Sequence, residues 1–347
     1  MRIAINEYDD LNHSQNTIPD FIRYCQECGV EYKLVDAYDK DIVSQIRDCD
    51  IFLWVPGVDS VSNKLLTASL LRAIESMDVL VYPNFSTGWH HDNKIAESFY
   101  LDANNAPIPK YWTFFEREKA LNWARKEAVF PLVAKLKSGS GSNNVRLIKT
   151  QGDAVSYIKR MFGKGISPSV NIFFKASTHY KAARGNWGEM KKRIARVPEF
   201  LRRYFKSREL PNEKGYVYFQ EFIPNDGYDI RIVVVNEKIS FCTRPVRKND
   251  FRASGGGTTE NRKELVPENV LVTARNFAQK LGMQKVAFDF VIDNRTGEGK
   301  IIEMCCEFPH AGGIVGAGGY WDFDFNWHEG ELDPSRELID MLIKMKT

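Results

Sequence analysis

The sequence predicts an α/β protein in which a parallel sheet is followed by antiparallel hairpins. Over roughly the first 85 residues, short apolar strands alternate with amphipathic helices, a pattern typical of a parallel sheet with helices on both faces. After residue 130 the strands are joined by turns rich in Gly, Ser and Asn, which favours hairpins. A length of 347 residues also indicates more than one packed unit.

The N-terminal region reads as four strands and three helices. Apolar runs predict the strands at 2–8, 30–37, 50–57 and 78–84. Helical periodicity predicts helices at 18–28, 41–49 and 60–77, the first closed by Gly29. No G-x-G-x-x-G follows the first strand, so a dinucleotide site is not indicated.

The remaining chain reads mainly as hairpins with a helix after each group. The predicted strands are 130–136, 144–150, 216–223, 229–236, 238–246, 286–293 and 299–306. The predicted helices are 152–162, 269–282 and 335–345. A Ser/Gly-rich tip joins the first two of these strands, and the turn NRTGEG joins the last two.

The bulk composition is that of an ordinary globular protein, with 43% hydrophobic and 27% charged residues. A net charge of +3 gives no indication of a nucleic-acid partner. The chain has no apolar run of the roughly 18 residues needed to cross a bilayer, and its start is unlike a signal peptide, so we expect a cytoplasmic protein. Cys25 and Cys28 form a C-x-x-C without a second ligand pair, which favours reduced structural thiols over a zinc site.

Two features indicate a nucleotide site, although each also has a simpler reading. Lys135 ends a strand before a hairpin tip of small residues, whose backbone N–H groups can approach phosphate oxygens. Such tips are often only turns. The stretch 218–235 places an acidic residue after an apolar strand end, which can hold a purine edge and a ribose, or can be an ordinary strand and turn.

Two further features concern charge. Arg244, Arg247 and Arg252 lie close to a Gly triplet, and three guanidiniums together favour an anion among them, the alternative being a solvated basic loop. Asp289 and Glu303 each interrupt an apolar strand of the last hairpin. A carboxylate is costly to bury there unless it meets a cation, so the pair predicts a Mg²⁺ site rather than two solvent-facing carboxylates.

Taken in order along the chain, these motifs resemble the ATP-grasp superfamily. The segments that carry the resemblance are Lys94 in HHDNKIAES, Lys135 before SGSGSNNV, QEFI at 220–223, DIR at 229–231, DFR at 250–252, and Asp289 with Glu303. The sequence is most similar to the ribosomal-protein glutamate ligases, and more distantly to D-alanine–D-alanine ligases. The resemblance covers roughly residues 85–310.

The resemblance implies an α/β, ATP-grasp fold with a Rossmann-like N-terminal domain and a nucleotide held between two α+β subdomains. We expect the N-terminal α/β domain at 1–90. The central ATP-grasp subdomain would be 91–225 with a basic insert at 176–214, and the C-terminal subdomain with the metal site 226–347.

The resemblance also implies roles for individual residues, with ATP and Mg²⁺ as cofactors. Lys94 and Lys135 would bind the ATP phosphates. A loop would fold over the phosphates, made of Ser138, Gly139, Ser140, Gly141 and Ser142. The adenine would be edged by Gln220, Glu221 and Ile223, and the ribose bound by Asp229. The γ-phosphate, acyl phosphate or acceptor would face Arg231, Arg244 and Arg252. The metal ligands would be Asp289 and Glu303.

The chain departs from the family pattern in three places, one of which is Ser254, where the DFR motif usually continues with asparagine. The metal motif Glu-x-Asn has Cys305 in place of Asn, and a thiol is a poor ligand for Mg²⁺, which leaves one or two metals open. In addition, the segment 176–214 carries eleven basic and four acidic residues with interleaved aromatics. It predicts either a solvated basic face or a surface for an anionic substrate or an acidic membrane.

The leading functional hypothesis is therefore an ATP-dependent carboxylate–amine ligase. It would form an amide through an acyl phosphate and release ADP and phosphate. The substrate would be a small molecule or a glycan precursor, for example a uronic acid, because the basic insert and the loop at 310–333, which is rich in Gly, aromatic and acidic residues, suit an anionic, sugar-bearing molecule. That loop is also explained by packing alone. The alternatives are a kinase on the same fold and a non-catalytic ATP-binding scaffold.

Overall fold

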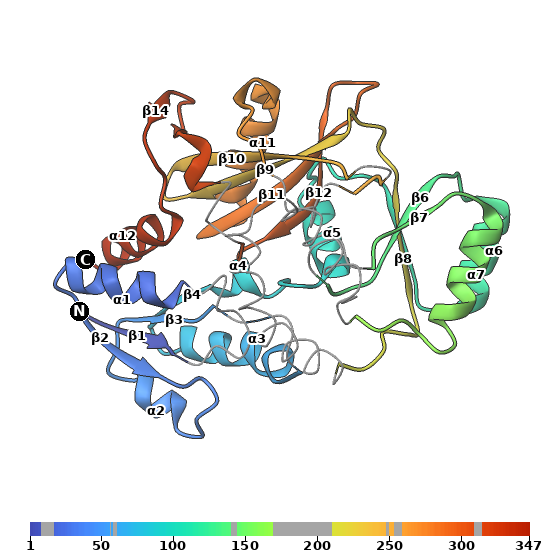
Figure 1. Cartoon of the computed structure of the whole chain (residues 1–347). Helices are drawn as coiled ribbons and strands as arrows, with labels where there is room; N and C mark the ends of the chain where they lie inside the picture. The colour runs from blue at the N-terminus through green and yellow to red at the C-terminus, as the bar shows by residue number, and fades with distance from the viewer. Residues whose placement is uncertain are drawn as a thin grey trace, which may run out of the picture.

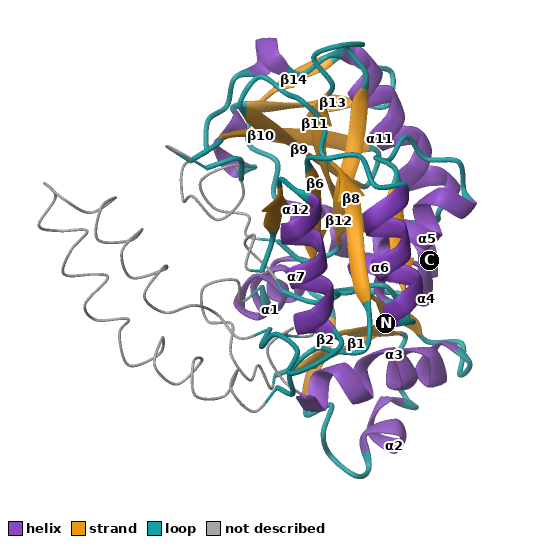
Figure 2. Ribbon diagram, turned by 90° about the vertical axis from the view of Figure 1, so that its right-hand side faces the viewer, coloured by secondary structure: helices purple, strands orange, loops and turns teal. Residues whose placement is uncertain are grey.

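A computed structural model describes residues 1–7, 17–55, 57, 61–139, 144–168, 210–247, 250–252, 259–308 and 314–347. Three sheets organise these residues, and Figures 1 and 2 show them from two directions, with the N-terminal sheet at the bottom of both views. Several sequence-based predictions lie outside the described residues. They are the loop residues Ser140, Gly141 and Ser142, the Gly triplet 255–257, and most of the basic segment 176–214.

The N-terminal sheet is parallel, with strand order β2-β1-β3-β4. Its strands are β1 (Arg2–Asn6), β2 (Glu31–Val35), β3 (Ile51–Leu53) and β4 (Leu80–Tyr82). Its helices are α1 (Ile18–Glu27), α2 (Ile42–Ile46), α3 (Val61–Glu75) and the last helix α12 (Pro334–Lys346). Ile3 and Ile5 pack toward α1 and α12, whereas Ala4 between them packs toward α2 and α3. The predicted parallel sheet covered on both faces is confirmed.

The second sheet is antiparallel, with order β5-β8-β6-β7. Its strands are β5 (Tyr111–Phe114), β6 (Leu132–Lys135), β7 (Arg146–Ile148) and β8 (Val217–Glu221). Two helices, α6 (Arg117–Lys126) and α7 (Gln151–Met161), share one apolar core with this sheet. A capping box between Thr150 and Asp153 fixes the start of α7. The predicted hairpin β6–β7 is therefore confirmed.

The third sheet has six antiparallel strands in the order β12-β11-β9-β10-β13-β14. The strands are β9 (Tyr228–Val235), β10 (Lys238–Pro245), β11 (Lys285–Ile292), β12 (Gly299–Cys305), β13 (Gly319–Asp322) and β14 (Trp327–Glu329). Helix α11 (Glu268–Lys280) packs on one face. Trp321 is buried in the same core, with Phe323, Phe325 and Trp327 packed against it. Packing therefore accounts for the aromatic residues of the loop after residue 319.

A turn and a bulge set the register of this sheet. Asn236 and Glu237 both have positive φ, at 46° and 60°, which makes a tight turn between β9 and β10. Between β11 and β12, the pairing shifts after Asp289, so that Phe290 pairs with Ile301 and Ile302 becomes the extra residue. The bulge therefore lies beside the Asp289–Glu303 pair.

Helix α5 (Lys94–Ala103) lies between the two antiparallel sheets (Figure 1). The short helix α4 (Phe85–Gly88) precedes it. Near the start of α5, Ile95 joins the core of the second sheet, and Leu101 near its end joins the core of the third. Asn93 caps the helix by accepting a hydrogen bond from the N–H of Ala96. The first turn of α5 is thereby fixed where the two sheets meet.

Two further predictions concern the whole chain. All six cysteines are free thiols, and Cys25 is buried whereas Cys28 is exposed, which agrees with a structural reading of the C-x-x-C. Within the described ranges, no helix has both the length and the apolar character that a bilayer crossing requires.

Candidate active site

A row of polar residues crosses the third sheet at right angles to its strands. Cys242 on β10 pairs with Arg231 on β9, which pairs with Asp289 on β11, and Asp289 pairs with Glu303 on β12. Because side chains alternate along a strand, partners in register point to the same face. The sheet thus brings together residues that are up to 72 positions apart in the sequence.

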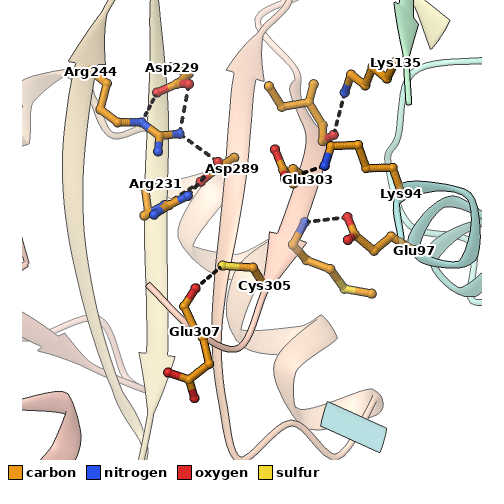
Figure 3. A network of polar contacts seen from close by, with 12 residues as sticks. Lys94, Glu97, Lys135, Asp229, Arg231, Arg244, Asp289, Glu303, Cys305 and Glu307 are labelled. Carbon is orange, nitrogen blue, oxygen red and sulfur yellow. Dashed lines mark hydrogen bonds and ion pairs between the residues drawn. The ribbon is translucent and has the colours of Figure 1, made fainter. Parts of the chain in front are cut away.

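Arginine and aspartate alternate along this face, as Figure 3 shows. Arg231 Nε and Nη2 donate to the two oxygens of Asp289, at 2.7 and 2.9 Å. Arg244 binds Asp229 in the same bidentate way, at 2.6 and 2.9 Å, and its Nη2 also lies 2.8 Å from Asp289 Oδ2. The four side chains form one buried chain of alternating charge.

Burial and charge oppose each other at Asp289. Burial alone would raise the pKa of this carboxyl group, but the guanidiniums of Arg231 and Arg244 outweigh it and hold the pKa well below its ordinary value. Asp289 is therefore ionised throughout the physiological range. The hydrogen bonds that satisfy it also fix the positions of both arginines.

Two lysines approach Glu303 from the opposite side (Figure 3). Lys94, the first residue of α5, has its Nζ 3.2 Å from Glu303 Oε1 and donates to the carbonyl of Gly139 at 2.8 Å. Lys135, at the end of β6, donates to the carbonyl of Ile302 at 3.0 Å. Ile302 is the bulged residue of β12, so the bulge turns a carbonyl toward Lys135.

Glu97 joins this group, although the sequence-based reasoning did not select it. It lies one helical turn after Lys94, is 4% exposed, and accepts a hydrogen bond from the N–H of Met304 at 3.4 Å. Burial and the nearby Glu303 raise its pKa to about 8. A signal for it exists in the sequence, since KIAES places a carboxyl three residues after a lysine on an otherwise apolar helix face.

The start of the small-residue loop is also held by acidic side chains. Glu213 accepts hydrogen bonds from the backbone N–H groups of Lys137 and Ser138, and from the hydroxyls of Ser138 and Tyr216. Asp92 accepts one from the N–H of Gly139, at 2.7 Å. Backbone N–H groups at the start of the loop therefore point toward carboxylates in this structure, as they would toward other anions.

A pocket of about 720 Å³, part of it open to solvent, lies between the second and third sheets. Its lining combines apolar side chains, among them Val133, Val291 and Phe251, with charged ones. The lining includes these predicted site residues: Lys135, Gln220, Glu221, Ile223, Asp229, Arg252, Asp289 and Glu303. Apolar lining residues together with a few polar and charged groups are the usual form of a small-ligand site.

The other predicted residues lie around this pocket. Lys94, Arg231 and Arg244 are not among its lining residues, but they contact two residues that are, Glu303 and Asp289. Arg247 and Arg252 both lie near Asp250. Its Oδ2 is 3.8 Å from Arg247 Nη1 and 2.6 Å from Arg252 Nη2. Each of the three arginines thus has an aspartate partner, Asp250 for two of them and Asp229 with Asp289 for Arg244.

The carboxylates fit a magnesium ion only in part. Glu303 lines the pocket and offers hard oxygen donors, which suit Mg²⁺ together with phosphate oxygens and water. Both oxygens of Asp289 accept hydrogen bonds from arginine. Cys305 donates to the carbonyl of Glu307 at 3.0 Å, and burial raises the pKa of its thiol to about 12. Among the described residues, no cluster of three or more acidic, His or Cys side chains is placed to hold a metal ion.

Comparison with known proteins identifies the fold. No family model matches the sequence. The chain superposes on a RimK domain ATP-grasp protein of Sphaerobacter thermophilus with a TM-score of 0.52 and 16% identity, covering 88% of this chain and 90% of that protein. The chain has the ATP-grasp fold. A D-alanine–D-alanine ligase of Bacillus anthracis in complex with ATP gives the same result, with a TM-score of 0.53, 13% identity, and coverage of 100% of this chain and 97% of that one.

One curated relative shares detectable sequence similarity with this ATP-grasp chain. It is the alpha-aminoadipate–LysW ligase LysX of Saccharolobus solfataricus, 21% identical over 229 residues. The match covers 64% of this chain and 65% of LysX, so it spans less than two thirds of the relative. The resemblance drawn from the sequence is thus confirmed at the level of the fold. The activity of this chain does not follow from such distant similarity.

Proposed function

We propose that this ATP-grasp chain is a ligase that uses ATP and Mg²⁺ to join a carboxylic acid to an amine. The supporting observation is the pocket between the two antiparallel sheets, whose lining combines apolar residues with lysine, arginine and carboxylate side chains. LysX of Saccharolobus solfataricus and the D-alanine–D-alanine ligase of Bacillus anthracis are ligases, the second in complex with ATP. Apolar lining residues suit a purine, and cationic ones suit a triphosphate.

Each group would then act by position and charge. Lys94 and Lys135 would hold phosphate oxygens, and Arg231, Arg244 and Arg252 would face the transferred phosphoryl group and the substrate carboxylate. Gln220, Glu221 and Ile223 would border the adenine, and Asp229 would lie near the ribose. Mg²⁺, when bound, would neutralise phosphate charge, with Glu303 as its ligand from the protein. Transfer of the phosphoryl group from ATP to the substrate carboxylate would give an acyl phosphate and ADP. The amine would then attack the acyl carbon and displace inorganic phosphate, which gives the amide.

The acid substrate is proposed to be small and anionic, for example a uronic acid or another glycan precursor. The support is the set of cationic groups at the pocket. Lys135 and Arg252 line it, and Arg231 and Arg244, which aspartates orient, contact its lining residue Asp289. Guanidinium groups held in this way suit planar carboxylates.

The reaction class can be tested with hydroxylamine as the amine. The chain, Mg²⁺ and ATP are incubated with a library of amino acids, small carboxylic acids and uronic-acid nucleotide sugars, and ADP and hydroxamates are measured. We expect at least one acid to stimulate ADP release and to give a hydroxamate. A stable phosphorylated product without hydroxamate would instead indicate a kinase. If the chain binds ATP but releases no ADP in the presence of any acid of the library, the ligase proposal is contradicted.

Nucleotide affinity should depend on pH. Burial and the positive charge of the nearby Lys94 lower the pKa of Lys135 to about 8. Burial and the nearby Glu303 raise the pKa of Glu97 to about 8. As pH rises through this range, Lys135 loses a positive charge and Glu97 gains a negative one. Both changes oppose phosphate binding, so affinity for Mg·ATP should be constant below pH 7 and fall by several-fold to about tenfold per pH unit above pH 8.

Calorimetric titration with Mg·ATP between pH 6 and 9.5 checks this dependence. Lys135→Arg keeps its charge at every pH used, and Glu97→Gln does not ionise, so each variant should remove part of the slope. A slope that is the same in the wild type and in both variants would show that neither group titrates in this range.

A further inference from the structure

The hydrogen bonds of Asp289 bear on how many metal ions the site holds. Its carboxylate accepts three hydrogen bonds from two arginines, at 2.7, 2.9 and 2.8 Å, and the residue is 2% exposed. Arg231 spans both oxygens, and Arg244 shares one of them with Arg231 (Figure 3). The carboxylate is thus already compensated by two positive charges in a site away from water.

A divalent cation on Asp289 would have to lie beside both guanidiniums. Repulsion between like charges a few ångströms apart is strong where water is excluded. Mg²⁺ also requires a nearly ideal octahedral set of oxygen donors. An oxygen that already accepts one or two charge-assisted hydrogen bonds is a poor member of that set. Asp289 is therefore suited to orient arginines, and poorly suited to bind metal.

Cys305, which stands at the Asn position of the Glu-x-Asn metal motif, is an independent indication that a second metal ion is not bound. Cys305 lies on β12 two residues after Glu303, and its Sγ donates to the carbonyl of Glu307. A protonated thiol that donates to a carbonyl cannot also serve as a ligand for a hard cation. Glu303 differs from both. Its side chain is 31% exposed and lines the pocket, and its ion pair with Lys94 joins Oε1 to the lysine Nζ at 3.2 Å.

We propose that Asp289 is a positioning residue for Arg231 and Arg244, and that the site binds a single divalent metal ion through Glu303 and nucleotide phosphates. This inference rests on the proposed use of Mg·ATP, and it replaces the expectation that Asp289 is itself a metal ligand. The two arginines balance the charges of Asp289 and Asp229, so no net negative charge is left at Asp289 to attract a second metal ion. The carboxylate of the acid substrate is the group that they are placed to receive.

The number of metals can be measured on the unmodified chain. Mn²⁺ and a non-hydrolysable ATP analogue are brought to equilibrium with the chain by dialysis, and bound manganese and bound nucleotide are both determined. We expect one Mn²⁺ per bound nucleotide. Two would overturn the single-metal proposal while leaving the ligase proposal intact. Absence of bound nucleotide would overturn both. The ratio does not depend on the fraction of chain that is folded.

Two variants separate positioning from ligation. Asp289→Asn should keep one Mn²⁺ per nucleotide, with the Kd for the Mn²⁺–analogue complex changed by less than about threefold, as expected for a group without contact to the metal. Its KM for the acid should rise by at least about tenfold, because the arginines lose their orientation. Glu303→Gln should weaken metal binding by at least about tenfold. Metal loss in Asp289→Asn equal to that in Glu303→Gln would overturn the positioning role.

Discussion

Replacing Lys135 by alanine is expected to lower kcat/KM for the ligase reaction by about a thousandfold, the upper range for losing one fixed group that stabilises developing charge. Lys135 is 6% exposed, ends β6 beside the pocket, and is held by the carbonyl of Ile302. A buried ammonium in a fixed position needs no reorganisation when phosphate charge shifts toward it. Of the two lysines described near Glu303, Lys94 remains in this variant. Nucleotide binding should therefore weaken, and kcat should fall by a larger factor than the affinity.

A matched control lies two residues away. Lys137 follows the same strand, but its side chain is exposed, and its contact with Glu213 is made by the backbone N–H. Lys137→Ala should therefore keep kcat/KM within about threefold of the wild type, the small effect usual for an exposed side chain. Rates are compared by ADP release with the acid found in the hydroxylamine assay, and folding by thermal unfolding. Activity of Lys135→Ala within tenfold of the wild type, with normal unfolding, would contradict the assignment of this lysine.

The fold was predictable from local patterns, because strands, helices and turns each have a sequence period or a punctuating residue. Asp289 and Glu303 could be selected for a similar reason, since a carboxylate inside an apolar strand requires a compensating charge. Their partners could not be found in this way. Which arginine faces Asp289 depends on the register between β9, β10 and β11, and that register is set by the turn at Asn236 and by packing across the sheet.

Glu97 and Glu213 are two further residues of the site whose roles depend on contacts between elements distant in the sequence. Glu97 matters because α5 lies between two sheets, where its first turn meets the bulge of β12. Glu213 matters because its chain returns beside the loop after β6, through the bridge between Ile166 and Glu213. Each residue is an ordinary acidic side chain until long-range packing brings it to lysines or to free backbone N–H groups. The pattern KIAES marks Glu97 as a candidate, but no pattern within one element shows which other element that residue will contact.

Arg244→Met is expected to destabilise the folded chain by about 3–5 kcal/mol, the usual cost of removing one partner from a buried charge network. Arg244 is 7% exposed and supplies the bidentate contact to Asp229, which is itself 3% exposed. Asp289 keeps its two hydrogen bonds from Arg231 in this variant, whereas Asp229 loses both of those from Arg244. The uncompensated charge is thus expected at Asp229, and the melting temperature should fall by about 5–10 °C.

The double variant Asp229→Asn/Arg244→Met tests that assignment. It removes one charge of each sign, so it should recover at least about half of the lost stability, because neighbouring residues in one network do not add independently. Arg252→Met is the comparison, since Arg252 is 22% exposed and pairs with a partly exposed Asp250; its cost should be below about 1 kcal/mol. Calorimetry of the four proteins gives the comparison. If the double variant is no more stable than Arg244→Met, the loss arises from packing of the arginine side chain, and Asp229 is not the charge that requires it.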